Sequence, residues 1–282
     1  MMDRNLRILV SNDDGIHSPG LAVLERVALT LSDDVWVVAP EFEQSGASHS
    51  LTLHDPLRMR ELEVRRYAVR GTPTDCVMMA VKHIIREKKP DLILSGINSG
   101  SNLAEDVTYS GTVAAAMEGA ALGIRSAALS QSYRYGGKGE IKWACGEHHA
   151  PHILRRLLEA PWPQEVLINI NFPDRAMNDV KGVQITVQGR RDVSEAVIDA
   201  RVDARGIDYY WLGFKRQTST PAIGTDLYAL REGYISVTPL HLDLTHHESR
   251  ESLRRCFEGF DTTHSPPGEG GPHAEQGSAR RR

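Results

Sequence analysis

Cysteine is scarce in this chain of 282 residues, which contains three, at Cys76, Cys145 and Cys256. Because they are far apart and odd in number, they indicate neither a disulfide framework nor a zinc cluster. This use of cysteine is typical of a reducing compartment, so a cytoplasmic location is expected.

Long apolar runs are also missing from the sequence. No uninterrupted apolar stretch reaches the roughly 18 to 20 residues that a membrane-spanning helix requires. The apolar run that ends at Val10 has no small-residue cleavage site behind it, so it predicts a first strand and not a signal peptide. We therefore expect no partnership with a membrane.

An excess of basic residues is the third absence. The formal net charge is -4 and the sequence pI is near 6.3, so extended nucleic acid is not an expected partner. What the chain does contain is 40% hydrophobic and 25% charged residues, which can build one large core or two modest ones.

Short, continuously apolar segments alternate with segments of helical spacing. Such runs are typical of strands buried on both faces of a parallel sheet. The expected strands are 6–10, 35–39, 92–94, 127–129 and 166–170, and the expected helices are 21–31, 74–87 and 111–122. Thr72 is the expected N-cap of the second helix and Pro73 its first residue. The order predicts an α/β fold with a Rossmann-like, doubly wound, mostly parallel sheet.

Other segments alternate apolar and polar residues. Residues 51–69 predict antiparallel strands inserted into the core. Residues 182–210, followed by a helix and a strand within 228–239, predict a β-rich C-terminal extension. We expect one domain over residues 1–260, with its core over about 1–190 and the extension over about 182–260. Residues 261–282 carry no large apolar side chain and gather glycine, proline and charge, so a disordered tail is expected.

Two adjacent carboxylates, Asp13 and Asp14, follow the first expected strand. In a doubly wound sheet, ligands bind beyond the carboxyl ends of the strands. Neighbouring like charges are unfavourable unless they are solvated or neutralised by a cation, and hard oxygen donors favour magnesium, manganese or calcium. The pair therefore indicates either a metal site or a solvated turn in which Asp14 caps the next helix.

Two more polar loops are expected at the same edge of the sheet. Residues 40–50 form a long, polar loop with small residues at its centre, which suits either close approach to a ligand or a mobile surface connection. Residues 95–100 place Asn98 at a strand end, where its amide oxygen can ligate a hard metal or hydrogen-bond a sugar.

Tyr109, Ser110, Gly111 and Thr112 open a helix of small residues. Free backbone N–H groups at a helix start, with hydroxyls on either side and the helix dipole behind them, suit phosphate. Plain N-capping by Ser110 or Thr112 explains one hydroxyl but leaves Gly111 and the other hydroxyl without a role. Together the acidic pair, the amide and this phosphate cradle predict one site.

These segments together resemble the SurE family of stationary-phase survival proteins, in order and in spacing. The motifs that carry the resemblance are residues 11–15, 45–48, 71–76, 95–100 and 109–112, and residues 169–173 and 234–240 resemble later markers of the family. The resemblance runs from about Arg7 to Ser130. Residues 190–207 and those after Phe260 look individual to this chain.

The resemblance implies a 5′-nucleotidase, a phosphomonoesterase that hydrolyses nucleoside 5′- and 3′-monophosphates and, in some members, short polyphosphate. It also implies one divalent cation per subunit, magnesium or manganese first, and a homodimer or homotetramer with exchanged C-terminal elements. The implied metal ligands fall on Asp13, Asp14, Ser45 and Asn98. The implied phosphate-side positions fall on Asn12, Ser110, Gly111 and Thr112.

In the expected mechanism, a metal-activated water attacks the phosphorus in line while the helix start stabilises charge on the phosphoryl oxygens. The expected catalytic residues are Asp13, Asp14 and Asn98. The proton donor to the leaving oxygen is not identified. His17 and His49 lie in the site loops, but a loop histidine is more often a surface or structural residue.

Two alternatives stay open. In a phosphoaspartyl phosphatase, Asp13 itself would be the nucleophile, although such enzymes usually show Asp-x-Asp spacing, which is absent here. In a non-catalytic nucleotide-binding module, the cradle would bind phosphate without hydrolysis, although carboxylates repel phosphate unless a cation lies between them.

Overall fold

The computed structural model describes residues 6–133, 140–191, 194–216 and 220–260. The expected disordered tail, residues 261–282, lies outside the described residues. Two units divide the chain, at residues 1–242 and 243–282. Among the described residues, none of the helices is both long enough and apolar enough to span a membrane.

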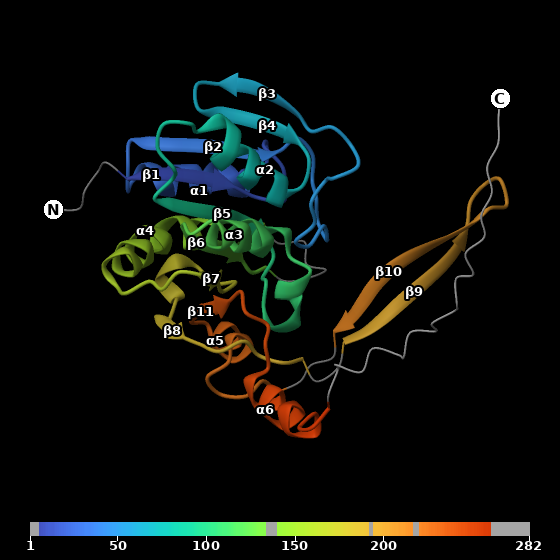
Figure 1. The fold of residues 1–282 in the computed structure, drawn as a ribbon. Helices are drawn as coiled ribbons and strands as arrows, with labels where there is room; N and C mark the ends of the chain where they lie inside the picture. The colour runs from blue at the N-terminus through green and yellow to red at the C-terminus, as the bar shows by residue number, and fades with distance from the viewer. Residues whose placement is uncertain (1–5, 134–139, 192–193, 217–219, 261–282) are drawn as a thin grey trace, which may run out of the picture. The chain divides into compact units, whose positions relative to one another are not determined.

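A nine-stranded sheet forms the centre of the first unit, in the order β3-β4-β2-β1-β5-β6-β7-β11-β8 (Figure 1). Neighbouring strands are parallel except for the antiparallel pairs β3–β4 and β7–β11. The strands are β1 (Arg7–Ser11), β2 (Asp34–Pro40), β3 (Arg58–Glu63), β4 (Arg66–Arg70), β5 (Leu92–Ser99), β6 (Arg125–Gln131), β7 (Val166–Phe172), β8 (Val183–Ile185) and β11 (Ile235–His241).

The strand order reverses at β1. From β1 the chain passes to β2 on one side and later to β5 on the other, and both pairs are parallel. This is the topological switch point of a doubly wound sheet, beyond which ligands bind. The predicted α/β fold is confirmed, and the loops after β1 and β5 lie at this point.

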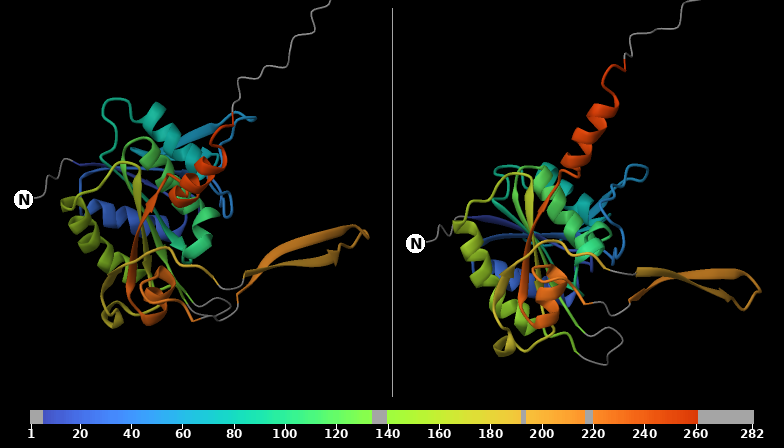
Figure 2. Two further views of the ribbon diagram at one scale, coloured as in Figure 1. Left: turned by 60° about the horizontal axis from the view of Figure 1, so that its bottom comes forward. Right: turned by 90° about the horizontal axis from the view of Figure 1, so that it is seen from below.

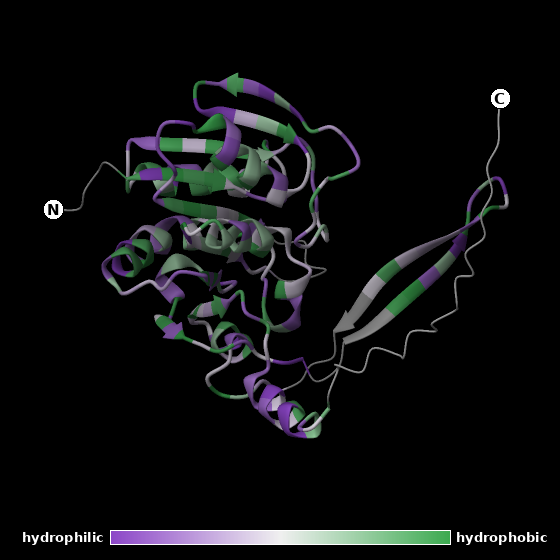
Figure 3. Cartoon of the chain, in the orientation of Figure 1, coloured by the Kyte–Doolittle hydropathy of each residue, from purple (hydrophilic) through white to green (hydrophobic). Residues whose placement is uncertain are grey.

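Helices cover both faces of the sheet (Figure 2). On one side lie α1 (Pro19–Leu29) and α4 (Trp143–Glu159), and on the other α2 (Pro73–Met79) and α3 (Gly111–Ala121). β1 serves both layers, because Ile8 and Val10 join the core on the α1 side while Leu9 joins the core on the α2 side, all fully buried. Burial on both faces explains the unbroken apolar run, which Figure 3 shows along the central strands.

The predicted start of α2 is confirmed in detail. Thr72 is the N-cap, Pro73 occupies the first turn, and Thr72 and Asp75 form a reciprocal capping box. The expected helix continues only to Met79 before a π-helical turn follows over Ala80–Ile84. Residues 51–57 form no strand, so β3 and β4 alone represent the expected insertion.

The C-terminal third contains several kinds of structure. β8, β11 and α5 (Asp226–Glu232) belong with the main sheet, whereas β9 (Ser194–Val202) and β10 (Asp208–Arg216) form a separate antiparallel pair. The second unit contains α6 (His247–Cys256), which the sequence did not predict. The three cysteines are free thiols, with Cys76 and Cys145 buried and Cys256 exposed.

Candidate active site

Asp13 is buried directly beyond β1, with 5% of its surface exposed. The hydroxyl of Thr112, at the start of α3, donates a hydrogen bond to Asp13 Oδ1. Burial raises the pKa of Asp13 from 3.8 to about 6, and the neighbouring Asp14 charge adds to this, while the bond from Thr112 lowers it. Once ionised, a carboxylate buried this deeply is stabilised by a compensating cation.

Asp14 lies next to Asp13 but is held by a different element. Its Oδ2 accepts a hydrogen bond from the backbone N of Ser99, at the end of β5, at 3.0 Å. Burial raises the pKa of Asp14, the bond from Ser99 lowers it, and the charge of Glu43 raises it again. Asp14 does not cap the following helix, since Ser18 is the N-cap of α1. The alternative in which Asp14 caps the next helix is therefore wrong.

The start of α3 is shaped around Asp13. Ser110 is the N-cap, and its hydroxyl accepts a hydrogen bond from Val113 N at 3.1 Å. A Cβ added at Gly111 would lie 2.7 Å from Asp13 Cβ, closer than real Cβ atoms approach. The capping interpretation thus holds for Ser110, while Gly111 makes room for Asp13 and Thr112 bonds to it.

Asn12 is almost fully buried beside the aspartates. Its Nδ2 donates to the Gly15 carbonyl at 3.0 Å and to Ser18 Oγ at 2.7 Å, which holds the loop closed onto α1. Its Oδ1 is a buried acceptor without a hydrogen-bond partner in the described part of the chain. Such an oxygen is costly to bury unless a ligand or water satisfies it.

The side chains of Ser45 and Asn98 form their hydrogen bonds with residues other than the two aspartates. The loop after β2 reaches the site through Gln44, whose backbone N donates to the Asp13 carbonyl at 2.8 Å. Ser45 itself is exposed, and its hydroxyl bonds Glu43 at 2.8 Å. Asn98, at the end of β5, donates from Nδ2 to the Gly100 carbonyl at 3.0 Å, which leaves its amide oxygen uncommitted within the described residues.

The two histidines of the site loops, His17 and His49, have different surroundings. His49 Nε2 lies 3.0 Å from Glu118 Oε2 on α3, and that pairing gives it a structural role. His17 instead lines a hollow of about 420 Å³ beside Asp14. The residues around this hollow come from the loops after β1, β2 and β5 and are Asp14, Gly15, His17, Ser18, Pro19, Glu41, Phe42, Glu43 and Ser99.

Glu41, Phe42, Glu43 and Ser99 were not singled out from the sequence, although all four lie in loops that it assigned to the site. Phe42 is 65% exposed and offers an aromatic surface to the hollow. The hollow also collects three carboxylates, on Asp14, Glu41 and Glu43. A phosphate ester could enter such a hollow only with a cation to offset this charge.

Fold and site together define a doubly wound α/β protein whose acidic pair lies at the switch point, against the start of a helix. A family model described as Survival protein SurE matches residues 8–195. The chain belongs to the SurE family.

Individual relatives cover nearly the whole length. The chain is 60% identical over 250 residues to a protein from Parvibaculum lavamentivorans named 5′-nucleotidase SurE, covering 89% of this chain and 90% of that one. A protein of the same name from Caulobacter vibrioides is 57% identical over 255 residues, covering 90% and 97%. The crystal structure of a SurE protein from Aquifex aeolicus aligns with a TM-score of 0.77 at 40% identity, covering 89% of this chain and 99% of that one.

Proposed function

We propose that this chain is a metal-dependent 5′-nucleotidase that hydrolyses nucleoside 5′- and 3′-monophosphates to nucleoside and phosphate. The observation that carries the proposal is the buried Asp13, held by Thr112 and adjacent to Asp14 at the switch point. Relatives that are 57 to 60% identical and named 5′-nucleotidase SurE support the same activity.

One divalent cation, magnesium or manganese, fits this donor set. Asp13 and Asp14 offer two hard oxygen ligands, and burial, which raises the pKa of both carboxyl groups, makes a compensating cation favourable once they are ionised. The described residues contain no group of three or more histidines, cysteines or carboxylates arranged for a metal, and we propose that neutral oxygens complete the shell. Asn98, with its uncommitted amide oxygen, and Ser45, one residue from the Gln44 contact, are the proposed further ligands.

The phosphoryl group is proposed to lie beside the aspartates, at the start of α3. The first bond along the helix runs from Ala114 N to the Ser110 carbonyl, so the N–H groups of Gly111 and Thr112 precede the helical ladder. The backbone N–H of Thr112 faces the Asp13 carboxylate, so the N–H of Gly111 and the helix dipole are the groups proposed to favour a dianion there. The unpartnered Oδ1 of Asn12 is an acceptor, so it suits a water or a cation beside the phosphoryl group and not the phosphoryl oxygens themselves.

A bound cation would polarise the phosphoryl group and lower the pKa of an attacking water. The side chains of this chain position that chemistry: Thr112 fixes the orientation of Asp13, and Ser99 N fixes that of Asp14. The start of α3 stabilises negative charge that spreads over the equatorial phosphoryl oxygens. Asp13, Asp14 and Asn98 are thus the proposed catalytic residues.

Oligomeric state and location are also proposals. Exposed apolar side chains on β9 and β10, among them Ile198, Trp211 and Leu212, support a homodimer or homotetramer in which a partner covers them. Three free cysteines support a reducing, cytoplasmic compartment.

Phosphate release from adenosine 5′-monophosphate tests the activity. We expect turnover with magnesium or manganese, its loss after dialysis against a chelator, and its return when metal is added back. A chain that binds the nucleotide tightly but releases no phosphate under any metal would be a binding module instead.

Asp13→Asn and Asp14→Asn test the mechanism. Both variants should lose activity by at least about 100-fold, because each removes a charge from the metal shell, and high metal should partly restore at least one. A missing nucleophile cannot be replaced by added cation. Phosphate trapped on Asp13 after rapid acid quenching would favour the phosphoaspartyl alternative and still leave the chain a phosphatase.

A further inference from the structure

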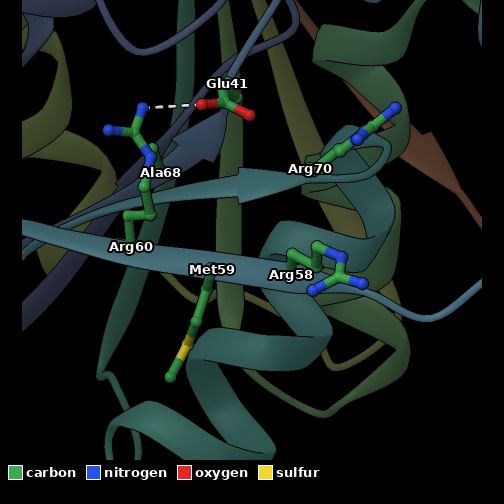
Figure 4. Close-up of a pocket in the computed structure, with 6 residues that line it drawn as sticks. All are labelled: Glu41, Arg58, Met59, Arg60, Ala68 and Arg70. Atoms are coloured by element: carbon green, nitrogen blue, oxygen red, sulfur yellow. Dashed lines mark hydrogen bonds and ion pairs between the residues drawn. The ribbon is translucent and has the colours of Figure 1, made fainter.

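Three arginines gather over the edge of the sheet that β3 and β4 form. Arg58, Arg60 and Arg70 line a hollow of about 440 Å³ together with Glu41, Met59 and Ala68 (Figure 4). Three guanidinium groups against one carboxylate leave an excess of two positive charges around this hollow. The excess is local, because the chain as a whole has a formal net charge of -4.

The register of β3 and β4 places like charges opposite each other. In this antiparallel pair Arg58 lies directly across from Arg70, and Arg60 across from Ala68. Directly opposite residues project on the same face, with Cβ atoms only about 5 Å apart, and like charges at this spacing destabilise a sheet. The small Ala68, 1% exposed, leaves the floor of the hollow open between the arginines.

The three arginines are not equivalent. Arg60 Nη2 pairs with Glu41 Oε1 at 2.6 Å, so the one carboxylate of the hollow is already neutralised. Within the described residues, Arg58 and Arg70 have no ion pair, and both are exposed. Figure 4 shows Arg60 turned toward Glu41, whereas the guanidinium groups of Arg58 and Arg70 point away from it. Two unpaired guanidinium groups on one face are a geometry that a multivalent anion satisfies.

We propose that Arg58 and Arg70 bind an anion of the phosphate or pyrophosphate class, at a site separate from Asp13 and Asp14. Glu41 lines both this hollow and the one beside Asp14, so the two sites share a wall. Planar guanidinium groups match phosphoryl oxygens in bidentate pairs, and a bound anion offsets the repulsion across the strands. The proposal does not rest on the nucleotidase activity, because the experiment that tests it measures anion binding without metal and without turnover.

Calorimetric titration with inorganic pyrophosphate tests this site. The protein is freed of divalent metal by dialysis, so that Asp13 and Asp14 repel the probe, and chloride at equal ionic strength corrects for screening. Wild-type protein should bind pyrophosphate saturably. Arg58→Gln/Arg70→Gln should bind it about tenfold more weakly or not at all.

A matched control removes two positive charges elsewhere. Lys82 and Arg205 are exposed and form no ion pair within the described residues, so Lys82→Gln/Arg205→Gln should change affinity by no more than about twofold. Melting curves give a second measurement: pyrophosphate should raise the melting temperature of the wild type and of the control, but not of Arg58→Gln/Arg70→Gln. Without pyrophosphate, that last variant should melt no lower than the wild type, because the repulsion is gone.

Three results would overturn the proposal. The first is no saturable binding by the wild type, the second is binding by Arg58→Gln/Arg70→Gln as tight as that of the wild type, and the third is an equal loss of affinity in both double variants. The last result would mean that pyrophosphate senses only the net charge of the protein.

Discussion

Asp13 titrates in a range that matters for metal binding. Its pKa in the folded, metal-free protein is about 6 against an ordinary 3.8, because burial disfavours the charged form. The folded state therefore holds this proton more tightly than the unfolded chain, and the free energy of unfolding falls as pH rises from about 4 through about 6.

The same proton competes with the cation. A metal requires the ionised carboxylate, so affinity for manganese should fall as pH drops below about 6, by up to about tenfold per pH unit for one proton. Calorimetric titrations between about pH 5 and about pH 7.5 measure this slope. Affinity that stays constant across this range would mean that Asp13 does not ligate the metal.

Thr112 acts on the same carboxylate through its hydroxyl. Thr112→Val keeps the volume but removes the hydrogen bond that lowers the pKa of Asp13, so the acid limb of the activity profile should move to higher pH and turnover should fall. The free energy of unfolding of the metal-free protein should drop by about 1 to 2 kcal/mol at neutral pH and by less at low pH, where Asp13 is protonated. Thr112→Ser should keep most of the activity. A loss of turnover without any change in the pH profile would mean that Thr112 does not act through the pKa of Asp13.

Helix α3 links stability to the site through its first turn. Ser110 caps the helix whose next two residues contact Asp13, so Ser110→Ala should cost about 1 kcal/mol of unfolding free energy and should also reduce turnover. Thr225 is the matched control, because it caps α5 in the same way and has no part in the proposed site. Thr225→Ala should cost a similar free energy and leave turnover unchanged. Equal losses of turnover in both variants would make the effect one of stability alone.

Elements with a strong local signal were predictable from the sequence. The run Ile8–Val10 is apolar throughout because both faces of β1 are buried, and that pattern is legible without a structure. Helix α4 gave no comparable signal, since its N-cap Lys142 makes no side-chain cap and Pro151 lies inside it. The π-helical turn after Met79 was equally hidden, because a change from four-residue to five-residue bonding leaves helical periodicity almost unaltered.

The site, too, was predictable from the sequence only where its signal is local. The acidic pair and the opening of α3 were visible because each is contiguous in sequence. The bond from Thr112 to Asp13 joins residues 99 positions apart, and no local pattern reports it. For the same reason the sequence connected Gly111 with phosphate and Thr112 with phosphate or capping, whereas in the structure Gly111 makes room for Asp13 and Thr112 donates to it.

At the scale of the whole molecule, the β9–β10 pair is an apolar feature that a single chain leaves uncovered. Ile198 and Leu212 lie opposite each other in register and are 67% and 69% exposed, and an isolated two-stranded sheet is marginally stable in water. We expect light scattering to give at least twice the 31.3 kDa of one chain at micromolar concentration.

Leu212→Glu tests whether this apolar face forms the interface. It introduces a charge into that face and should shift the mass toward 31.3 kDa while the circular dichroism of the main sheet persists. A wild type that is monomeric throughout would refute the homodimer or homotetramer. A Leu212→Glu variant that keeps the full mass would place the interface elsewhere.

Because the three thiols are buried to different extents, their reactivity reports whether the chain is folded. Burial raises the pKa of Cys76, and raises that of Cys145 to about 11, so neither thiol ionises readily in the folded protein. Cys256 is exposed on α6. A maleimide dye should therefore attach at one position per native chain and at three once the chain is denatured. Counting attached dye by mass spectrometry would show, molecule by molecule, whether a variant had kept its core closed.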